Sequence, residues 1–498
     1  MRIGFLNPQG NFDSKDSYWT EHPDFGGQLV YVKEVALAMA AHGHQVDIIT
    51  RQIIDDKWPE FAAPLDSYPG HDNVRIVRIP CGPPQFLPKE QLWPYLGTDW
   101  ANGIIRFYEN DGGLPDFFTT HYGDGGLVGA VLKQKTGVPF TFTGHSLGAQ
   151  KLDKLHPTPD NLAEINRRFN FTQRIMAERM AMNHAARIIT STRQEQLEQY
   201  GHPAYHGAID PVADDDHFAV IPPGVNRRVF SPEPGEADAR VSARIDAALA
   251  RDVPEHRRNL PLVVCSSRLD QKKNHLGLVK AFVESQQLCE LANLAIAIRG
   301  LDNPLQQRDQ LKGEERAILD DVARLLAEHN LWHVITSFSL NSQAELAAAY
   351  RVTAARRSVF SLTATYEPFG LAPLEAMSCG LPAVVTKNGG PSESLFEAAA
   401  SKKYGVLVDP ADPKDIASGL IAALGAPESW TYYHEAGIDR VVSRYTWDRT
   451  AEGYLAVIEQ AFNQPPAAGK LPIPPYFTNP TPENEIPSVA LASLYFKE

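Results

Sequence analysis

The amino-acid sequence predicts an α/β protein made of two doubly wound domains. The chain has 498 residues, which is too many for one ordinary hydrophobic core. Short apolar runs alternate with longer helical patterns in both halves, and strands that are apolar on both faces belong in parallel sheets covered by helices. Prolines and glycines interrupt this alternation at residues 220–236, "VIPPGVNRRVFSPEPGE", which indicates a domain boundary.

Six strands are predicted in each half. In the first half they are "RIGFLN", "QVDIITR", "VRIVRIP", "DFFTTHY", "PFTFTGH" and "ARIITST", starting at residues 2, 45, 74, 116, 139 and 186. In the second half they are "PLVVCSS", "LAIAIRG", "HVITSFS", "SVFSLTA", "PAVVTKN" and "YGVLVDP", starting at residues 261, 294, 333, 358, 382 and 404. In the first half, helical patterns start at residues 26 ("GGQLVYVKEVALAMAAHG") and 125 ("GGLVGAVLKQKTG").

The predicted domains are residues 1–228 and 229–464, with the proline-rich tail 465–498 returning to the first domain. Ligands of open parallel sheets gather at the carboxyl ends of the strands. A cleft between two such domains is therefore the expected site.

Composition excludes several classes of function. Lys and Arg total 47 against 60 Asp and Glu, a net charge of −13, which argues against a nucleic-acid partner. The four cysteines form no C-x-x-C pair, so we expect neither a zinc site nor disulfides, and a reducing, cytoplasmic environment. The start "MRIGFLNPQG" is typical of a buried strand rather than a signal peptide, and no apolar run reaches the roughly 20 residues of a membrane helix.

Two carboxylates eight positions apart mark the stretch 363–380, "TATYEPFGLAPLEAMSCG". Backbone amides around Gly370 and Leu371 would open a helix and form an anion site suited to a diphosphate. Glu367 could then accept hydrogen bonds from sugar hydroxyls, and Glu375 from a ribose diol. The alternative is that Glu367 is a solvated loop acid and Glu375 only stabilises the positive end of its helix.

A second stretch, "SSRLDQKKNH" at residues 266–275, follows a predicted strand and carries Arg268, Lys272 and Lys273. Such cations at a strand end suit a phosphate leaving group, although Lys272 could equally lie on a solvated face. "NGGPSES" at residues 388–394 and the glycine pair in "DFGGQLVYVKE" supply further glycine turns that lead into helices.

Taken together, these motifs resemble those of retaining glycosyltransferases of family 4, which have the two-domain GT-B fold. "EPFGLAPLE" resembles the E-x7-E motif of that family, and "PDFGGQLVYV", "HYGDGG", "TGHSLG", "SSRLDQKKN" and "NGGPSE" match its other landmarks in order. The resemblance covers nearly the whole chain and is closest to the sucrose-phosphate synthases. It implies transfer of glucose from UDP-glucose or ADP-glucose to fructose 6-phosphate, which would form sucrose 6-phosphate.

The resemblance also implies roles for individual residues. Glu375 would hold the ribose and Glu367 the donor glucose, while His145 would lie beside that sugar at the reacting centre. The groups implied at the diphosphate are Arg268, Lys273, Gly27, Gly370 and Leu371. The implied acceptor residues, whose cations would bind the 6-phosphate, are Gly26, Gln28, Lys89, Tyr122, Lys151 and Arg174.

Each role has a simpler alternative. His145 could be a hydrogen-bonded core histidine, and Arg174 could form a surface ion pair with Glu178, four residues further on. A sucrose synthase would use free fructose, and a mannosylfructose-phosphate synthase would use GDP-mannose with the same acceptor residues. The chain has no stretch that resembles the phosphatase-like region of the plant synthases, so we expect a separate sucrose-phosphate phosphatase.

Retention of configuration favours a front-face substitution, because no acid in the matched motifs could attack the opposite face of the anomeric carbon. We expect no essential metal and no cofactor beyond the nucleotide-sugar substrate. The acids Asp214, Asp215 and Asp216 in "ADDDHF" could gather a hard cation, but they match no landmark. We interpret them as a solvated turn.

Three readings from other classes remain. "FTFTGHSLGAQ" contains G-x-S-x-G, typical of an α/β-hydrolase with Ser146 as nucleophile. That reading leaves the motifs around Arg268 and Glu367 without a purpose. "YGDGGLVGA" does not fit the G-x-G-x-x-G pattern of a nicotinamide enzyme. A sugar-nucleotide binding protein without activity is disfavoured because both donor and acceptor residues are present.

Overall fold

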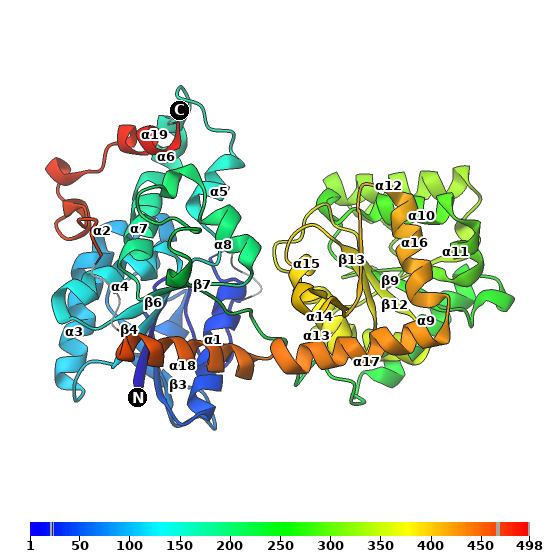
Figure 1. The fold of residues 1–498 in the computed structure, drawn as a ribbon, viewed down its shortest axis with the longest axis horizontal. Helices are drawn as coiled ribbons and strands as arrows, with labels where there is room; N and C mark the ends of the chain where they lie inside the picture. Colours follow the sequence, from blue (N-terminus) through cyan, green and yellow to red (C-terminus); the bar gives the residue numbers. More distant parts are fainter. Residues whose placement is uncertain (20–21, 23, 465–468, 497–498) are drawn as a thin grey trace. The chain divides into compact units, whose positions relative to one another are not determined.

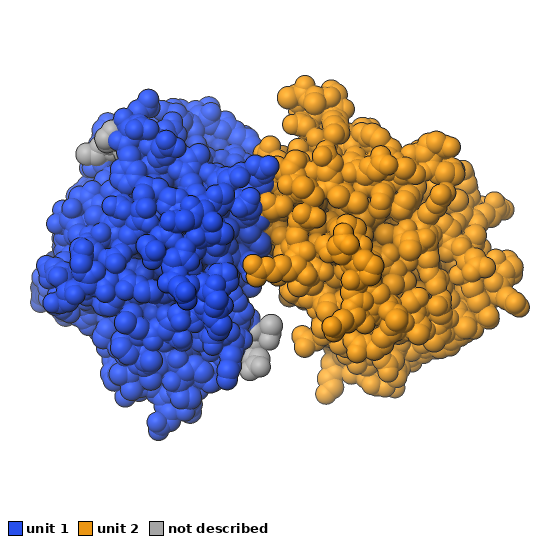
Figure 2. Space-filling view, turned by 90° about the horizontal axis from the view of Figure 1, so that it is seen from below, with its two compact units in different colours: residues 1–223, 447–498 blue, residues 224–446 orange. Residues whose placement is uncertain are grey.

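The computed structural model describes residues 1–19, 22, 24–464 and 469–496. The chain forms two compact units, residues 1–223 with 447–498 and residues 224–446, which are coloured separately in Figure 2. Each unit is built on its own parallel or mainly parallel sheet with helices on both faces. The predicted fold class of two doubly wound α/β domains is confirmed.

Both boundaries differ from the predicted ones. The first unit ends at residue 223 rather than 228, and the chain returns to it at residue 447 rather than 465. The return is earlier because helix α18 (Trp447–Asn463) buries its apolar face, including Tyr454 and Ile458, in the core of the first unit. Of the predicted returning tail, residues 465–468 and 497–498 lie outside the described residues.

The sheet of the first unit has the strand order β3-β4-β2-β1-β5-β6-β7-β8. The strands are β1 (Arg2–Leu6), β2 (Gln45–Arg51), β3 (Leu65–Ser67), β4 (Val74–Ile79), β5 (Phe117–His121), β6 (Phe140–Thr143), β7 (Arg187–Thr190) and β8 (Phe218–Val220). All pairs are parallel except β3 with β4. The six predicted strands are confirmed, and the two additional strands are short edge strands.

Helices cover both faces of this sheet (Figure 1). Helix α1 (Gly27–Ala41) packs with α18 on one face. The other face holds α3, α4, α5 and α7, whose apolar residues form a second cluster. The helices not yet bounded are α2 (Trp93–Tyr95), α3 (Ala101–Asn110), α4 (Tyr122–Thr136), α5 (Gly148–Asp153), α6 (Leu162–Phe169), α7 (Phe171–His184), α8 (Arg193–Gln199) and α19 (Ser488–Tyr495).

The second unit has a six-stranded parallel sheet in the order β11-β10-β9-β12-β13-β16. These strands are β9 (Leu262–Ser266), β10 (Asn293–Ile298), β11 (Ile335–Ser339), β12 (Val359–Leu362), β13 (Ala383–Thr386) and β16 (Val406–Val408), and they confirm all six predictions. A separate two-stranded hairpin is formed by β14 (Phe396–Glu397) and β15 (Lys402–Lys403).

Its helices again pack on both faces of the sheet. Apolar residues of α10, α12 and α16 form one cluster, and those of α9, α13, α14 and α17 form the clusters on the other face. The bounds are α9 (Asp238–Asp252), α10 (His275–Glu284), α11 (Gln286–Leu291), α12 (Gly313–Glu328), α13 (Gln343–Ala355), α14 (Leu371–Ser378), α15 (Pro391–Ser394), α16 (Pro413–Leu424) and α17 (Pro427–Arg444).

Helix α18 is fixed to the first unit by polar as well as apolar contacts. The hydroxyl of Tyr454 lies 3.0 Å from that of Tyr31 on α1 and 2.6 Å from that of Thr143 at the end of β6. A buried hydroxyl without a partner is costly, so this network specifies how the helix docks.

Among the described residues, no helix is both long enough and apolar enough to span a bilayer. The four cysteines are free thiols, and three of them are buried.

Because α18 belongs to the first unit, the change Ile458→Ala should destabilise that unit alone. Ile458 is fully buried, and removing such a side chain costs about 2–5 kcal/mol. Hydrogen exchange followed by mass spectrometry should show faster exchange in β1 and β2 and unchanged exchange in β9 and β10. The exposed control Val442→Ala on α17 should change neither unit. Faster exchange confined to the second unit would contradict the assignment.

Candidate active site

The predicted donor residues lie on loops that follow the carboxyl ends of strands in the second unit. Lys273 ends the short helical turn after β9, and Glu367 lies in the loop after β12. The structure brings them together: Lys273 Nζ lies 2.6 Å from Glu367 Oε2, with 23% and 14% of the two side chains exposed. Glu367 is therefore not a solvated loop acid.

The glycine turn after β13 holds this loop in place. The Glu367 amide donates to the Asn388 carbonyl (3.1 Å), and the Gly390 amide donates to the Glu367 carbonyl (3.0 Å). Gly389 has φ +95°, and a Cβ there would lie 2.1 Å from the Glu367 carbonyl oxygen. Only glycine fits so close an approach, which gives the "NGGPSES" motif a role in positioning Glu367.

Gly370 precedes helix α14 with φ +90° and provides no side-chain cap, so the first amides of the helix are left to bind a ligand. Leu371, the first residue of the helix, is 39% exposed. Glu375 is partly buried one turn further on, and its carboxylate has no hydrogen-bond partner among the described residues. Burial raises its pKa to about 7.

Arg268 lies after β9, where it is exposed and forms no ion pair with a described residue. Two of the predicted donor cations thus differ: Lys273 is held by Glu367, whereas Arg268 is free to reach a ligand. An exposed guanidinium with several donors in one plane suits a diphosphate.

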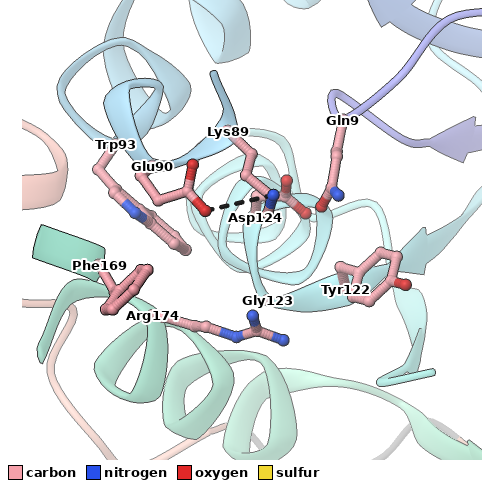
Figure 3. A pocket seen from close by; sticks show the side chains of 9 residues that line it. All are labelled: Gln9, Lys89, Glu90, Trp93, Tyr122, Gly123, Asp124, Phe169 and Arg174. Atoms are coloured by element: carbon pink, nitrogen blue, oxygen red, sulfur yellow. Dashed lines mark ion pairs between the residues drawn. The ribbon is translucent and has the colours of Figure 1, made fainter. Parts of the chain in front are cut away.

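A pocket in the first unit joins three of the six predicted acceptor residues (Figure 3). It is open to solvent, and its empty space of about 360 Å³ includes part of that open solvent. It is lined by the predicted Lys89, Tyr122 and Arg174 and by Gln9, Glu90, Trp93, Gly123, Asp124 and Phe169. In Figure 3, Trp93 and Phe169 lie on the side opposite Tyr122, and Lys89 and Arg174 reach in between.

The ion pair between Arg174 and Glu178 is buried rather than on the surface. Arg174 Nε donates to Glu178 Oε1 (3.0 Å), and Glu178 is fully buried. Glu178 also accepts from the Gly148 amide (2.9 Å) and the Tyr205 hydroxyl. Arg174 Nη2 donates to the Ser146 carbonyl (2.6 Å), so the guanidinium is fixed at its edge and points into the pocket.

Three cations interact in and beside this pocket. Lys89 pairs with Asp24 and with Glu90 (3.2 Å); burial alone would lower its pKa, but these acids raise it. Lys151, on α5, has no such partner among the described residues. Burial, together with the charges of Arg174 and Lys89, lowers the pKa of Lys151 to about 8.

Sequence reasoning missed several pocket residues, of which Asp124 is the most informative. It is buried, and its carboxylate accepts from the Gly125 amide (2.8 Å). Burial raises its pKa to about 6, although Arg174 and Lys89 oppose this shift. It lies within the quoted motif "HYGDGG", and Gln9 lies just beyond β1, so the rule of strand ends could have identified both.

Gly26, Gly27 and Gln28 form the start of α1. Gly26 is the N-terminal cap without a side-chain hydrogen bond, and a Cβ at Gly27 would meet no atom within 4 Å. The fold does not require glycine at position 27, whereas close approach of a ligand to the backbone would. Gln28 is buried, and its Nε2 has no partner among the described residues.

His145 follows β6 with φ +54°, a strained conformation for this residue. Its Nε2 lies 2.9 Å from Nδ1 of His121, and its ring lies 5.3 Å from that of Tyr122, in the acceptor pocket. In a nucleophile elbow the serine itself occupies the strained position. Here that position belongs to His145 rather than Ser146, which disfavours the hydrolase reading.

The acidic turn at Asp214–Asp216 lies on the surface, as expected. Asp215 pairs with Arg193 and accepts from Gln196 (3.0 Å), while Asp214 accepts from the Asp210 amide (2.9 Å). These acids bind their own neighbours.

The raised pKa of Glu375 has a consequence for stability. Between about pH 4.5 and 7 the folded state binds more protons at this site than the unfolded state, so stability falls as pH rises through this range. The cost approaches about 3 kcal/mol above pH 7. Relative to wild type, Glu375→Gln should therefore gain stability between pH 4.5 and 8, as measured by denaturant unfolding, and the exposed control Glu315→Gln should not. An equal effect of both variants at all pH values would contradict this assignment.

Comparison with known proteins agrees with the geometry. Residues 246–440 match the family described as "Glycosyl transferases group 1", and residues 26–206 match a "Glycosyl transferase 4-like domain". The chain is 44% identical over 462 residues to a "Probable sucrose-phosphate synthase" of Thermosipho melanesiensis, covering 92% of this chain and 97% of that protein. It is 31% identical over 488 residues to a protein of the same name from Vicia faba, covering 87% of this chain but 45% of the plant protein.

The chain thus spans about half the length of the plant relatives. Among solved structures, a sucrose-phosphate synthase from Thermosynechococcus elongatus aligns with a TM-score of 0.61 and 23% identity, covering 93% of this chain and 99% of that one. This likeness shows the shared GT-B fold. The chain belongs to the group 1 glycosyltransferases and, within them, is an enzyme of the sucrose-phosphate synthase type.

Proposed function

We propose that this enzyme transfers glucose from UDP-glucose or ADP-glucose to fructose 6-phosphate with retention of configuration, forming sucrose 6-phosphate. The observation that carries the proposal is the convergence of Lys89, Lys151 and Arg174 in and beside one pocket of a protein whose net charge is −13. The name of the Thermosipho melanesiensis relative agrees with it.

The charges favour a phosphorylated acceptor over free fructose. Bringing cations together and removing them from water costs free energy unless an anion neutralises them. Glu90 and Asp24 neutralise Lys89, and Glu178 neutralises Arg174, but Lys151 has no such partner among the described residues. A phosphate dianion would give Lys151 an anionic partner.

The remaining lining of the pocket suits a sugar. Trp93 and Phe169 offer apolar ring surfaces, and Gln9 and Asp124 offer polar groups that can bind hydroxyls. A few polar groups on a mainly apolar wall are typical of small-molecule sites.

On the donor side, Arg268 and Lys273 would neutralise charge that grows on the diphosphate as the glycosidic bond breaks. The amides of Gly370 and Leu371 would bind the same group, and Glu375 would bind the ribose. In a front-face substitution, the acceptor hydroxyl attacks the anomeric carbon on the side of the leaving group. The hydroxyl proton passes to the departing diphosphate oxygen, so no enzyme nucleophile is needed.

We further propose that the reaction needs no metal ion, since the cations above can balance the diphosphate. Activity unchanged by exhaustive chelation would support this proposal, and activity restored only by an added metal would refute it. The free thiols support a cytoplasmic location. Removal of the product's phosphate would require a separate phosphatase.

The donor and acceptor are tested by product analysis over a matrix of substrates. UDP-glucose, ADP-glucose and GDP-mannose should each be mixed with fructose 6-phosphate and with fructose. We expect a phosphorylated, non-reducing disaccharide from a glucose donor and fructose 6-phosphate. Equal use of free fructose would indicate a sucrose synthase, and product from GDP-mannose alone would indicate a mannosyl transfer.

Arg174→Ala should impair use of the phosphorylated acceptor specifically. A charge-assisted hydrogen bond is worth roughly 1.5–3 kcal/mol, so kcat/KM for fructose 6-phosphate should fall about 10- to 150-fold. Affinity for the nucleotide sugar should change little. Steady-state kinetics with varied acceptor and calorimetric titration with the donor would measure these two effects.

Because the Arg174–Glu178 pair is buried, this variant will also lose stability. Arg167→Ala controls for the change in charge, since Arg167 lies on α6 and is 74% exposed. A loss of acceptor efficiency no larger than that of Arg167→Ala, at a temperature where both variants are folded, would contradict the assigned role.

Lys273→Ala should reduce turnover by roughly 100-fold, as expected when one preorganised group is removed from a developing charge. Its neighbour Lys272 is exposed and gives a matched control. Lys272→Ala should retain nearly full turnover in the same assay. Similar turnover in the two variants would exclude Lys273 from the diphosphate site.

A further inference from the structure

His121 is a buried, titratable residue to which the proposed reaction assigns no role. It ends β5 and has no exposed surface. Its ring stacks on that of Phe5, with the two centroids 5.7 Å apart, and the centroid of the His145 ring lies 5.1 Å from its own. A buried imidazole beside a proposed active-site residue either stabilises the fold or positions that residue.

The contact between the two histidines is a hydrogen bond. His121 Nδ1 lies 2.9 Å from His145 Nε2, and on its other side His121 Nε2 lies 3.3 Å from the Thr119 hydroxyl. Both nitrogens of His121 are therefore used within the protein. Nε2 of His145 is used as well, whereas its Nδ1 has no hydrogen-bond partner among the described residues and is left for a ligand.

Both rings are neutral at physiological pH. Burial lowers the pKa of His145 to about 3, and burial together with the neighbouring His145 lowers the pKa of His121 well below its usual value. The titratable groups facing the pair are Tyr31 and Tyr122, which stay protonated because burial raises the pKa of each. A single proton therefore lies between the two facing nitrogens, and the tautomer of one ring fixes that of the other.

The backbone at His145 makes such a restraint necessary. Its φ of +54° is sparsely populated, and a residue persists there only when its surroundings determine it. The ring is restrained from a second side by Tyr31, whose edge packs at 4.9 Å. Tyr31 is held in turn through its hydroxyl by Tyr454 of α18.

His121 also connects two parts of the site. The next residue, Tyr122, has φ +60° and lines the acceptor pocket. The backbone of His121 thus positions Tyr122 in the wall of the acceptor pocket, and its side chain forms the hydrogen bond to His145. A small shift at this residue would move both.

We propose that His121 is a positioning residue that fixes the orientation and tautomer of His145, so that Nδ1 of His145 faces the donor sugar. The proposal rests on the proposed function, because it takes His145 to be the group that contacts that sugar. It adds a residue that acts only through His145.

The first test compares three substitutions of His121. His121→Phe keeps the stacked ring but removes the hydrogen bond, and turnover should fall on the order of 100-fold with KM for both substrates within about twofold. The amide nitrogen of asparagine can occupy the place of Nδ1, whereas that of glutamine reaches the place of Nε2. His121→Asn should therefore recover a large part of the turnover and His121→Gln little of it.

The second test is a double-mutant cycle with His145→Ala, run on the same assay. If His121 acts through His145, His121→Phe should cause no further loss in the His145→Ala background. An equal loss in both backgrounds would show an independent, structural role and overturn the inference. Nitrogen-15 NMR should show complementary tautomers of His121 and His145 in wild type and a changed tautomer population of His145 in His121→Phe.

These outcomes separate the inference from the proposed function. Wild-type turnover in His145→Ala would refute the proposed role of His145 itself. Loss of activity in His145→Ala with wild-type turnover in His121→Phe would refute only the positioning role. If His121→Phe does not fold, the asparagine and glutamine variants decide the question, and equal turnover in those two would contradict the geometry.

Discussion

The mutual repulsion of Lys89, Lys151 and Arg174 is the constraint on which the acceptor side of this enzyme depends. Three cations near one pocket are unfavourable in an unliganded protein, and most of the surrounding arrangement offsets this cost. Glu178 is fully buried beneath Arg174, and Asp24 and Glu90 hold Lys89. Lys151 has no such partner among the described residues, and burial together with the charges of Arg174 and Lys89 lowers the pKa of its amine to about 8. The acids named here equal the cations in number, but none of them forms an ion pair with Lys151.

On the donor side, a cation is held in place by an ion pair with an acid of the same site. Lys273 is paired with Glu367, so its charge is oriented before a ligand arrives, and the glycine turn at Gly389 fixes the backbone of that acid. Preorganised charges of this kind lower the free energy of a transition state because they need not reorient during the reaction. The two histidines at the ends of β5 and β6 follow the same principle with a hydrogen bond in place of an ion pair.

The sequence was sufficient to predict the fold and to locate the motifs of the site, because strand periodicity and the loops at strand ends are local features. All twelve predicted strands formed, and Lys273 and Glu367, which the motifs assigned to the same donor site, form an ion pair. The features that the sequence did not predict depend on contacts between residues that are far apart along the chain. The return at residue 447 depends on apolar packing of α18, and the buried state of Glu178 depends on Gly148 and Tyr205. Nothing in the sequence near His121 indicates that its partner lies 24 residues away.

The measurement that tests the central claim most directly is proton uptake on acceptor binding at pH 8. A sugar phosphate is already a dianion there, so a phosphate beside Lys151 should raise the pKa of that amine and draw a proton from the buffer. Calorimetric titration with fructose 6-phosphate in two buffers of different ionisation enthalpy should show uptake of a fraction of a proton. The uptake should be absent in Lys151→Met. Binding without uptake, or equal affinity for free fructose, would contradict the account.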